Sequence, residues 1–494
     1  MTETAGLRNK TQNIGLILGP IIFAILLFSD LVPDNPAATR TAALAALAAT
    51  WWITEAIPLA ATALIPLILF PLLGVMSGKS VAVQYFNSTI FLFVGGFLIA
   101  GAMEKCNLHK RIALRIIRII GVSPAGIIFG FMAASAFLSA FISNTATAVM
   151  MLPIAIAVIS KAEAVSGERD AKRFATGLML GIAYAASVGG VATLVGTPPN
   201  LVFHRIYEMS FPNAPEISFG LWTIFALPLT LVMLAVIWIL LTKVFFKSNK
   251  TIIDKHTIDD EYKALGKMSS DEKAVMIIFV LTAVLWMFRK DLNIGALHLP
   301  GWSNLLSSPK LIDDGTVAIF MSMLLFFIPS KNKGTMILSK DAFGRLPWGI
   351  IILFGGGFAL AAGFGESGLS ESLGKMLSGA ADSPILVTIA SVSAGLTFLT
   401  EMTSNTATTQ TMLPILASVS KATGINPLLL MIPATISASF AFMLPVATPP
   451  NAIIFGSGKV RIADMVKVGI VLNLIGVFVT TVLFLTWGRF IFGI

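Results

Sequence analysis

The sequence predicts an all-α polytopic membrane protein, and three observations support this fold class. Of the 494 residues, 56% are hydrophobic and only 12% are charged, against about 25% charged in an ordinary soluble domain. Three stretches without any Asp, Glu, Lys or Arg are long enough to cross a bilayer: 174–203, 217–242 and 468–488. The apolar runs also lack the period-two alternation of a membrane β-barrel, so helices are the expected spanning elements.

The remaining elements follow from the same pattern of apolar runs and charges. Residues 1–40 are predicted to hold an uncleaved N-terminal helix, because many spans follow the apolar run that resembles a signal peptide. The one long hydrophilic stretch, 243–273, contains seven Lys and six acidic residues, and its part 246–273 is interpreted as a cytoplasmic linker between two membrane halves. Further apolar runs lie near 41–73, 89–103, 125–160, 274–288, 315–330, 346–364, 385–420 and 427–455.

The two halves of the chain, 41–245 and 274–494, repeat each other. The segment SNTATAVMMLPIA begins at Ser143, and SNTATTQTMLPIL begins at Ser404, with nine of thirteen positions identical. Upstream of these segments, FLFVGGF at 91–97 recurs as ILFGGGF at 352–358. The pair Ser123-Pro124 recurs as Ser383-Pro384. Downstream, Gly-Thr-Pro-Pro-Asn from Gly196 recurs as Ala-Thr-Pro-Pro-Asn from Ala447. Four matches in the same order indicate a duplication.

The distribution of Lys and Arg predicts that the repeats are inverted. Five Lys or Arg lie in 104–125 and four more in 160–173, so both flanks of 123–160 are expected in the cytoplasm, with a hairpin between them. The flanks of 383–420 hold one lysine each, so this second hairpin is expected to open outward. Counting outward predicts about 11 transmembrane helices plus two re-entrant helical hairpins, a cytoplasmic N-terminus and an external C-terminus. Whether each hairpin stops midway or crosses fully twice stays open.

Inverted repeats with interrupted helices are typical of secondary transporters, whose sites lie where the interruptions meet. Ser, Asn and Thr are poor in helix interiors and good at N-caps, and Thr-Pro-Pro-Asn cannot continue a helix. The freed carbonyl and hydroxyl oxygens suit a hard cation such as sodium, and helix N-termini favour an anion.

The charges of these motifs narrow the ligand. A helix N-terminus carries roughly +0.5 charge, so two of them cannot neutralise a dianion, and neither motif contains Lys or Arg. Co-bound sodium ions most simply supply the missing positive charge. Because the tripeptide is duplicated, the expected substrate has two similar ends, as a dicarboxylate does.

Together with Asn107-Leu-His-Lys-Arg, these paired motifs resemble the divalent-anion:sodium symporter family over about residues 40–494. The resemblance implies a homodimeric elevator in the cell membrane, with scaffold and transport domains each built from both repeats. It implies transport of C4 dicarboxylates such as succinate, malate and fumarate, coupled to sodium. It also implies substrate contacts from Ser143, Asn144, Thr145, Pro198, Ser404, Asn405, Thr406 and Thr448. One sodium is implied near Ser139, Ser143, Asn144 and Gly196, and a second near Thr400, Thr403, Asn405 and Ala447.

Several alternatives remain at this point. A sodium-independent dicarboxylate exchanger, or a citrate or sulfate transporter, fits the same scaffold, whereas a channel or a membrane enzyme is more distant. The paired glycine clusters favour close helix packing over ligand contact. Glu55 and Glu401 are acids beside apolar runs, and Glu401 is either a coupling residue or a structural partner. The sequence predicts no organic cofactor, no nucleic-acid partner and no enzymatic activity; membrane lipid, sodium and dicarboxylate are the expected partners.

Overall fold

The computed structural model describes residues 9–29, 31–120, 123–247, 256–295, 297–331, 334–376 and 384–494. Within these residues, seven helices are long and apolar enough to cross a membrane, and five shorter apolar helices accompany them. The predicted all-α polytopic class is therefore confirmed. The predicted count of eleven spans stays a prediction.

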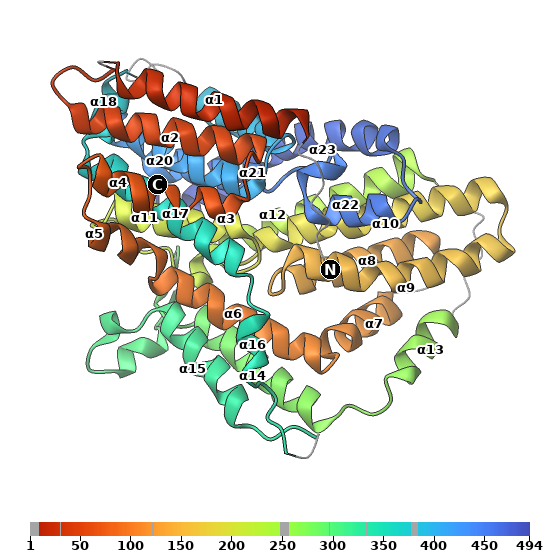
Figure 1. Ribbon diagram of the computed structural model, residues 1–494. Helices are drawn as coiled ribbons and strands as arrows, with labels where there is room; N and C mark the ends of the chain where they lie inside the picture. Colours follow the sequence, from red (N-terminus) through yellow and green to blue (C-terminus); the bar gives the residue numbers. More distant parts are fainter. Residues whose placement is uncertain are drawn as a thin grey trace.

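The N-terminal segment and the start of the first repeat together form a layer of helices. α1 lies along α2 in Figure 1, and the indole of Trp51 donates a hydrogen bond of 3.0 Å to the carbonyl of Gly15. α3 and α4 pack against a helix of the second half, so the two halves meet here as well. The helices of this layer are α1 (Lys10–Leu27), α2 (Pro36–Thr54), α3 (Leu59–Thr62), α4 (Ile65–Leu72) and α5 (Gly78–Ala82).

The rest of the two halves repeats the same order of elements. The first half contains α6 (Ser88–Lys105), α7 (Leu108–Ile120), α8 (Pro124–Ser139), α9 (Asn144–Val165), α10 (Glu168–Val191), α11 (Pro198–Ser210) and α12 (Phe219–Ile239). The second half contains α17 (Trp348–Glu366), α18 (Leu369–Met376), α19 (Ile385–Thr400), α20 (Asn405–Thr423), α21 (Pro427–Ala438), α22 (Pro449–Gly456) and α23 (Ile462–Leu483). α12 and α23 each continue into a π-helical turn, at Leu240–Phe245 and Phe484–Gly488.

The other helices and the strands belong to the predicted linker, to the start of the second half and to the end of the chain. They are α13 (His256–Ala264), α14 (Ser270–Met287), β1 (Leu292–Ile294), β2 (Leu297–Leu299), α15 (Asp314–Phe327), α16 (Asp341–Gly344) and α24 (Arg489–Phe492). β1 and β2 form a short antiparallel pair. α13 and the start of α14 lie within the predicted linker, whose residues 248–255 are outside the described part. α13 is held against α7 by ion pairs that include Arg118 with Asp259 at 2.7 Å.

Both predicted hairpins are present as pairs of helices joined by short turns. The first consists of α8 and α9, whose second arm runs to Val165, five residues beyond the predicted end at 160. The second consists of α19 and α20 and reaches Thr423 instead of 420, and its predicted start at 383 lies outside the described residues. Each tandem Ser-Asn-Thr stands at the turn of its hairpin, as the sequence predicts.

The broken helices exchange partners between the halves. α11, which follows the first Thr-Pro-Pro-Asn, packs against α20 and α21 of the second half. α22, which follows the second, packs against α9 and α10 of the first half. Because each half supports the other half's hairpin, the two hairpin tips and the two helix breaks are brought into one region.

The glycine clusters allow close packing, as predicted. A Cβ atom at Gly95 of α6 would lie 2.6 Å from the Cβ of Ala318 on α15. A Cβ atom at Gly356 of α17 would likewise lie 2.6 Å from the Cβ of Ala63, beside α3. A larger side chain at either position would force the two helices apart.

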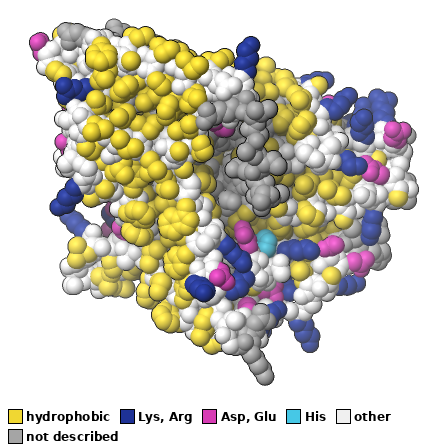
Figure 2. All heavy atoms as spheres, in the orientation of Figure 1, with side chains coloured by type: hydrophobic (Ala, Val, Ile, Leu, Met, Phe, Trp, Pro, Cys, Tyr) yellow, Lys and Arg dark blue, Asp and Glu magenta, His cyan; other side chains and the backbone are white. Residues whose placement is uncertain are grey.

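The outer surface carries exposed hydrophobic side chains along entire helices. On α1, Ile17 and Ile25 are 63% and 64% exposed, and Figure 2 shows hydrophobic side chains covering the face formed by α1 and α2. Charged side chains gather toward the right and lower edges of the same view. An apolar surface of this extent fits a lipid environment, in agreement with a multi-pass membrane protein.

A buried ion-pair cluster joins three helix ends. The guanidinium of Arg289, only 1% exposed, contacts Asp314 at the start of α15 and Glu216 ahead of α12, each at 2.5 Å. Lys290 also pairs with Glu216. Burial alone would raise the pKa of Glu216, but Arg289 and Lys290 outweigh it and hold this pKa below its ordinary value.

Candidate functional site

One cavity of about 470 Å³ contains nearly all the residues that the sequence singles out. It lies where the turns of both hairpins meet both helix breaks, and its walls are completed by Phe93, Phe97 and Leu353. Of the predicted residues, it is lined by Ser143, Asn144, Thr145, Gly196, Pro198, Thr403, Ser404, Asn405, Thr406, Ala447 and Thr448. Ser139 and Thr400 do not line it; both are fully buried directly behind the hairpin turns.

Four helices begin at the cavity because each motif caps a helix. Ser143 caps α9, and its hydroxyl accepts a hydrogen bond of 3.1 Å from the backbone N–H of Ala146. Ser404 stands at the same position ahead of α20. Thr197 and Thr448 precede the proline pairs that open α11 and α22. Helix N-termini carry partial positive charge, so this geometry favours an anion in the cavity.

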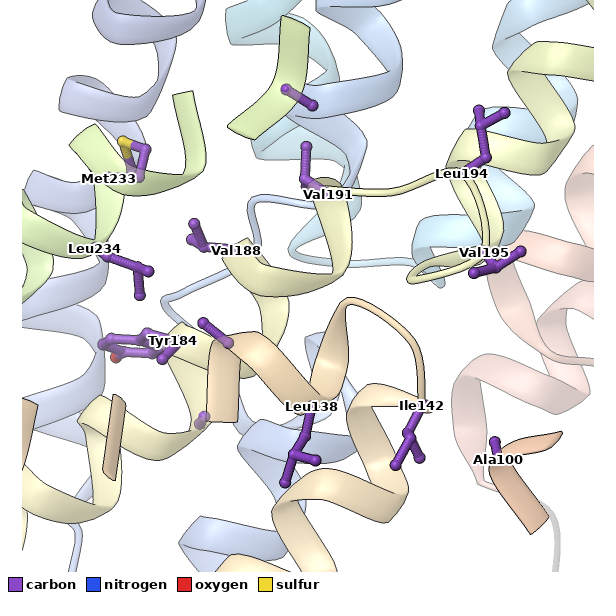
Figure 3. Packing of buried hydrophobic residues seen from close by; sticks show 14 of the residues in the cluster. Ala100, Leu138, Ile142, Tyr184, Val188, Val191, Leu194, Val195, Met233 and Leu234 are labelled. Carbon is purple, nitrogen blue, oxygen red and sulfur yellow. The ribbon is translucent and has the colours of Figure 1, made fainter. Parts of the chain in front are cut away.

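The turn of the first hairpin faces the unwound stretch of the first repeat. Figure 3 shows Leu138 and Ile142 near the turn, across from the loop that runs from Val191 to Val195. The hydroxyl of Thr193, in this loop, donates a hydrogen bond to the carbonyl of Ala140 in the turn. The hairpin turn and the helix break are therefore fixed to each other by packing and by a direct hydrogen bond.

Neutral oxygen atoms converge behind the first turn. The hydroxyl of Ser139 contacts Asn144 Oδ1 and donates a hydrogen bond of 2.7 Å to the carbonyl of Ala186. A Cβ atom at Gly190 would lie 2.7 Å from Asn144 Oδ1 and 3.1 Å from the carbonyl oxygen of Gly196. The amide and carbonyl oxygens therefore approach the same point, beside a position where only glycine leaves room. Hydroxyl, amide and carbonyl oxygens are the donors that suit a hard cation.

The second turn repeats this arrangement with equivalent residues. The hydroxyl of Thr400 lies 2.7 Å from Asn405 Oδ1 and donates a hydrogen bond of 2.9 Å to the carbonyl of Ala438. Thr400 and Asn405 stand 261 residues after Ser139 and Asn144. The duplication seen in the sequence therefore extends to the hydrogen bonds behind the cavity.

Glu401 binds the unwound chain of the second repeat. Its carboxylate accepts hydrogen bonds from the backbone N–H groups of Phe442 at 2.6 Å, Met443 at 2.9 Å and Leu444 at 3.1 Å. The side-chain amide of Asn473 on α23 donates a fourth at 2.8 Å. Four donors to one carboxylate fix the path of this segment. Of the two roles that the sequence leaves open for Glu401, this geometry favours the structural partner.

Three further residues that the sequence analysis did not single out support the breaks. The side-chain amide of Asn200 donates a hydrogen bond of 2.7 Å to the carbonyl of Thr193. The side-chain amide of Asn451 donates one of 3.0 Å to the carbonyl of Ala441. The Tyr184 hydroxyl donates a hydrogen bond of 2.8 Å to the carbonyl of Phe442 and so joins the two halves. The repeated Pro-Pro-Asn was a visible signal for the asparagines, whereas nothing in the local sequence distinguishes Tyr184.

The cavity has no fixed positive charge among the described residues that line it. Glu55 is the only charged side chain among them, and its backbone adopts a left-handed conformation with φ of 48°. Lys and Arg are the side chains that usually neutralise a bound carboxylate. A bound anion is therefore held by helix N-termini and neutral donors unless cations accompany it.

Comparison with known proteins assigns the family. Residues 10–494 match the model for the sodium:sulfate symporter transmembrane region. The chain belongs to this symporter family. The match covers both repeats, so the predicted resemblance to divalent-anion:sodium symporters is confirmed.

Family members with high similarity are bacterial. A protein of Staphylococcus saprophyticus named sodium-dependent dicarboxylate transporter SdcS is 44% identical over 483 residues, covering 95% of this chain and 90% of the relative. The protein of the same name from Staphylococcus aureus strain NCTC 8325 is 46% identical over 476 residues, covering 94% and 89%.

Two solved transporter structures share the fold of this family member. The YdaH transporter of Alcanivorax borkumensis has a TM-score of 0.56 at 12% sequence identity and covers 97% of this chain and 98% of its own. MtrF of Neisseria gonorrhoeae, which represents a class of antimetabolite efflux pumps, also has a TM-score of 0.56 at 10% sequence identity, and the likeness covers 98% of this chain and 96% of MtrF. At these identities the likeness concerns the fold alone.

Proposed function

We propose that the protein is a secondary transporter that moves C4 dicarboxylates such as succinate, malate and fumarate across the cell membrane together with sodium. The observation that carries this proposal is the single cavity lined by both Ser-Asn-Thr turns and both helix breaks, without Lys or Arg among its described lining residues. The family match supports sodium as the coupling ion, and the names of the staphylococcal relatives support both sodium and a dicarboxylate substrate.

In this proposal the two hairpin turns bind the two ends of the substrate. Asn144 and Thr145, with Ser143, hold one carboxylate, and Asn405 and Thr406, with Ser404, hold the other. Pro198 and Thr448 lie beside them at the starts of α11 and α22. The equivalent hydrogen bonds behind both turns support this pairing, because equivalent sites bind equivalent groups.

Two sodium ions occupy the oxygen clusters behind the turns. The first is assigned to Ser139, Ser143, Asn144 and Gly196, and the second to Thr400, Thr403, Asn405 and Ala447. Each cluster contains an asparagine side chain that also borders the cavity. A sodium ion that orients this asparagine therefore affects substrate binding directly, and its charge offsets that of the dianion.

The wider mechanism follows from the predicted topology. We propose that the protein works as a homodimer with a cytoplasmic N-terminus and an external C-terminus. Its inverted repeats form a scaffold domain and a transport domain that carries the site across the bilayer as an elevator. The exchanged packing of α11 and α22 supports this, because it joins both hairpins into one body.

Uptake by purified protein in liposomes tests the proposal. Labelled succinate should accumulate when an inward sodium gradient is imposed and should not accumulate when choline replaces sodium. Excess unlabelled malate or fumarate should compete, whereas citrate and sulfate should compete weakly.

The other outcomes separate the alternatives. Uptake that requires internal dicarboxylate and ignores sodium would identify an exchanger. Sodium-driven uptake of sulfate or citrate in preference to succinate would replace the proposed substrate.

A further inference from the structure

A second cavity, of about 290 Å³, adjoins the candidate site. It lies between α6, the turn ahead of α9 and the segment 338–347 that contains α16. Phe97 and Ser143 line both cavities, so they stand at the boundary between the two. We call this second cavity the vestibule. Its volume is far above the approximately 15 Å³ that one water molecule needs, so it has room for a small polar solute.

The vestibule holds the positive side chains that the central cavity lacks. Among the described residues that line either cavity, only Lys105 and Arg345 are cationic. The ammonium of Lys105 already donates 2.8 Å to the carbonyl of Ile337. Arg345 has no carboxylate within 4 Å in the described part of the chain, and its side chain is exposed. Lys105 keeps its charge but has one N–H group engaged, so Arg345, with its planar set of donors, is the better placed of the two cations to pair with a carboxylate.

Two acidic residues also line the vestibule, and one of them interacts with Arg345. Glu104, on α6, is close enough to Arg345 to interact with it electrostatically, and Asp341 opens α16. Glu104 is thus a built-in competitor for the guanidinium. A dianion carries more negative charge than the single carboxylate of Glu104, so it can displace Glu104 from Arg345. The interaction with Arg345 is therefore selective for anions of higher charge.

We propose that the vestibule is a second anion position, in which one carboxylate of a dicarboxylate pairs with Arg345 as the substrate passes between the central site and the cytoplasm. The vestibule is assigned to this side because Glu104 and Lys105 in its lining belong to the stretch 104–125 that is predicted to be cytoplasmic. The inference rests on the proposed function. Its physical reason is the charge balance. Once sodium leaves, the central cavity offers a dianion no fixed cation among its described lining residues, whereas the vestibule beyond Ser143 offers Arg345, and Lys105 beside it is already bonded to the carbonyl of Ile337. Arg345 therefore assists release and capture on that side only.

The test measures the apparent KM for succinate from each side of oriented liposomes. Arg345→Gln should raise the cytoplasmic KM by about three- to tenfold, the range for one charge-assisted contact near water, and leave the external KM unchanged. Glu104→Gln should change the cytoplasmic KM in the opposite direction, because it removes the competitor. Lys340→Gln is the matched control, since Lys340 is an exposed cation of the same segment that does not line the vestibule.

The outcomes distinguish the vestibule from the proposed function. An unchanged cytoplasmic KM in Arg345→Gln, or an equal change on both sides, overturns the vestibule while wild-type succinate uptake keeps the transport proposal intact. If wild-type protein moves no dicarboxylate with sodium, the proposed function fails, and the vestibule fails with it. Should Arg345→Gln yield no folded protein, Glu104→Gln decides, and an unchanged or raised cytoplasmic KM in that variant overturns the inference.

Discussion

Replacing Gly190 with alanine should selectively damage the first proposed sodium site. The new Cβ would lie 2.7 Å from Asn144 Oδ1, whereas ordinary contacts begin near 3.4 Å and real Cβ atoms almost never approach within 3.0 Å. The amide oxygen must therefore move by about 0.3 to 0.7 Å. Ligand distances in metal sites hold to within about 0.2 Å, so Asn144 would leave its coordinating position.

The expected loss is about 10- to 100-fold in sodium affinity, as for other changes that displace a metal ligand through its neighbours. Succinate affinity at fixed sodium should fall as well, because the coupling between two ligands is reciprocal. Titration of sodium by calorimetry or thermal shift, with choline keeping the ionic strength constant, measures both effects.

Gly395→Ala on α19 provides the matched control, because an added Cβ there meets nothing within 4 Å. A glycine-to-alanine change inside a helix normally stabilises by about 0.5–1 kcal/mol. At Gly190 this gain offsets part of the strain from the new contacts, so the protein should still fold and the loss should appear in sodium affinity. Wild-type sodium affinity in Gly190→Ala would refute the placement of this site.

Three more predictions test the anion site, the topology and the ion-pair cluster. Asn144→Ala and Asn405→Ala should each abolish succinate uptake in liposomes while the protein remains folded, since a buried partner left unpaired costs about 1–3 kcal/mol; wild-type uptake in either variant would exclude the paired turns. In a background with Cys106 replaced, Ser166→Cys and Thr257→Cys should react with impermeant thiol reagents from the cytoplasm. Ser378→Cys, which lies outside the described residues, should react from the exterior. Labelling of positions 166 and 378 from the same face would exclude inverted repeats. Glu216→Gln should destabilise the protein by about 1–3 kcal/mol at neutral pH. Because the folded pKa of Glu216 is depressed, its contribution to the free energy of unfolding is present above the ordinary value of 4.5 and is lost as the pH falls through the folded pKa. The unfolding temperatures of variant and wild type should therefore converge in acid. A difference in unfolding temperature that is independent of pH would contradict the role of the ion-pair cluster.

The sequence predicted the parts of the site that local rules determine. Thr-Pro-Pro-Asn cannot continue a helix, and Ser, Asn and Thr favour helix N-caps. The duplication of both motifs indicated that the interruptions belong together. The structure accordingly places Asn144, Asn405 and Thr448 around one cavity. The five-residue separation of Ser139 from Asn144, by contrast, did not show that Ser139 lies behind the cavity wall.

What the sequence could not predict depends on contacts between distant segments. The partners of Glu401 lie 41 and more residues further along the chain, and Tyr184 reaches Phe442 across 258 residues. Such pairs are set by the exchanged packing of the two halves, which no local pattern encodes. Gly190 is a similar case, because its role appears only once Asn144 and Gly196 are placed beside it.

The absence of Lys and Arg from the described lining of the central cavity gives the proposed coupling its direction. A fixed guanidinium beside Asn144 or Asn405 would bind a dicarboxylate in any salt, and the anion would then cross without sodium. Neutral donors, together with the carboxylate of Glu55, leave the dianion poorly neutralised until cations arrive. Couplings of about 1–3 kcal/mol between bound ligands correspond to a roughly 5- to 150-fold change in affinity. Succinate should therefore bind that much more tightly in sodium than in choline, and equal affinity in the two salts would remove sodium from the mechanism while leaving the paired turns as the anion site.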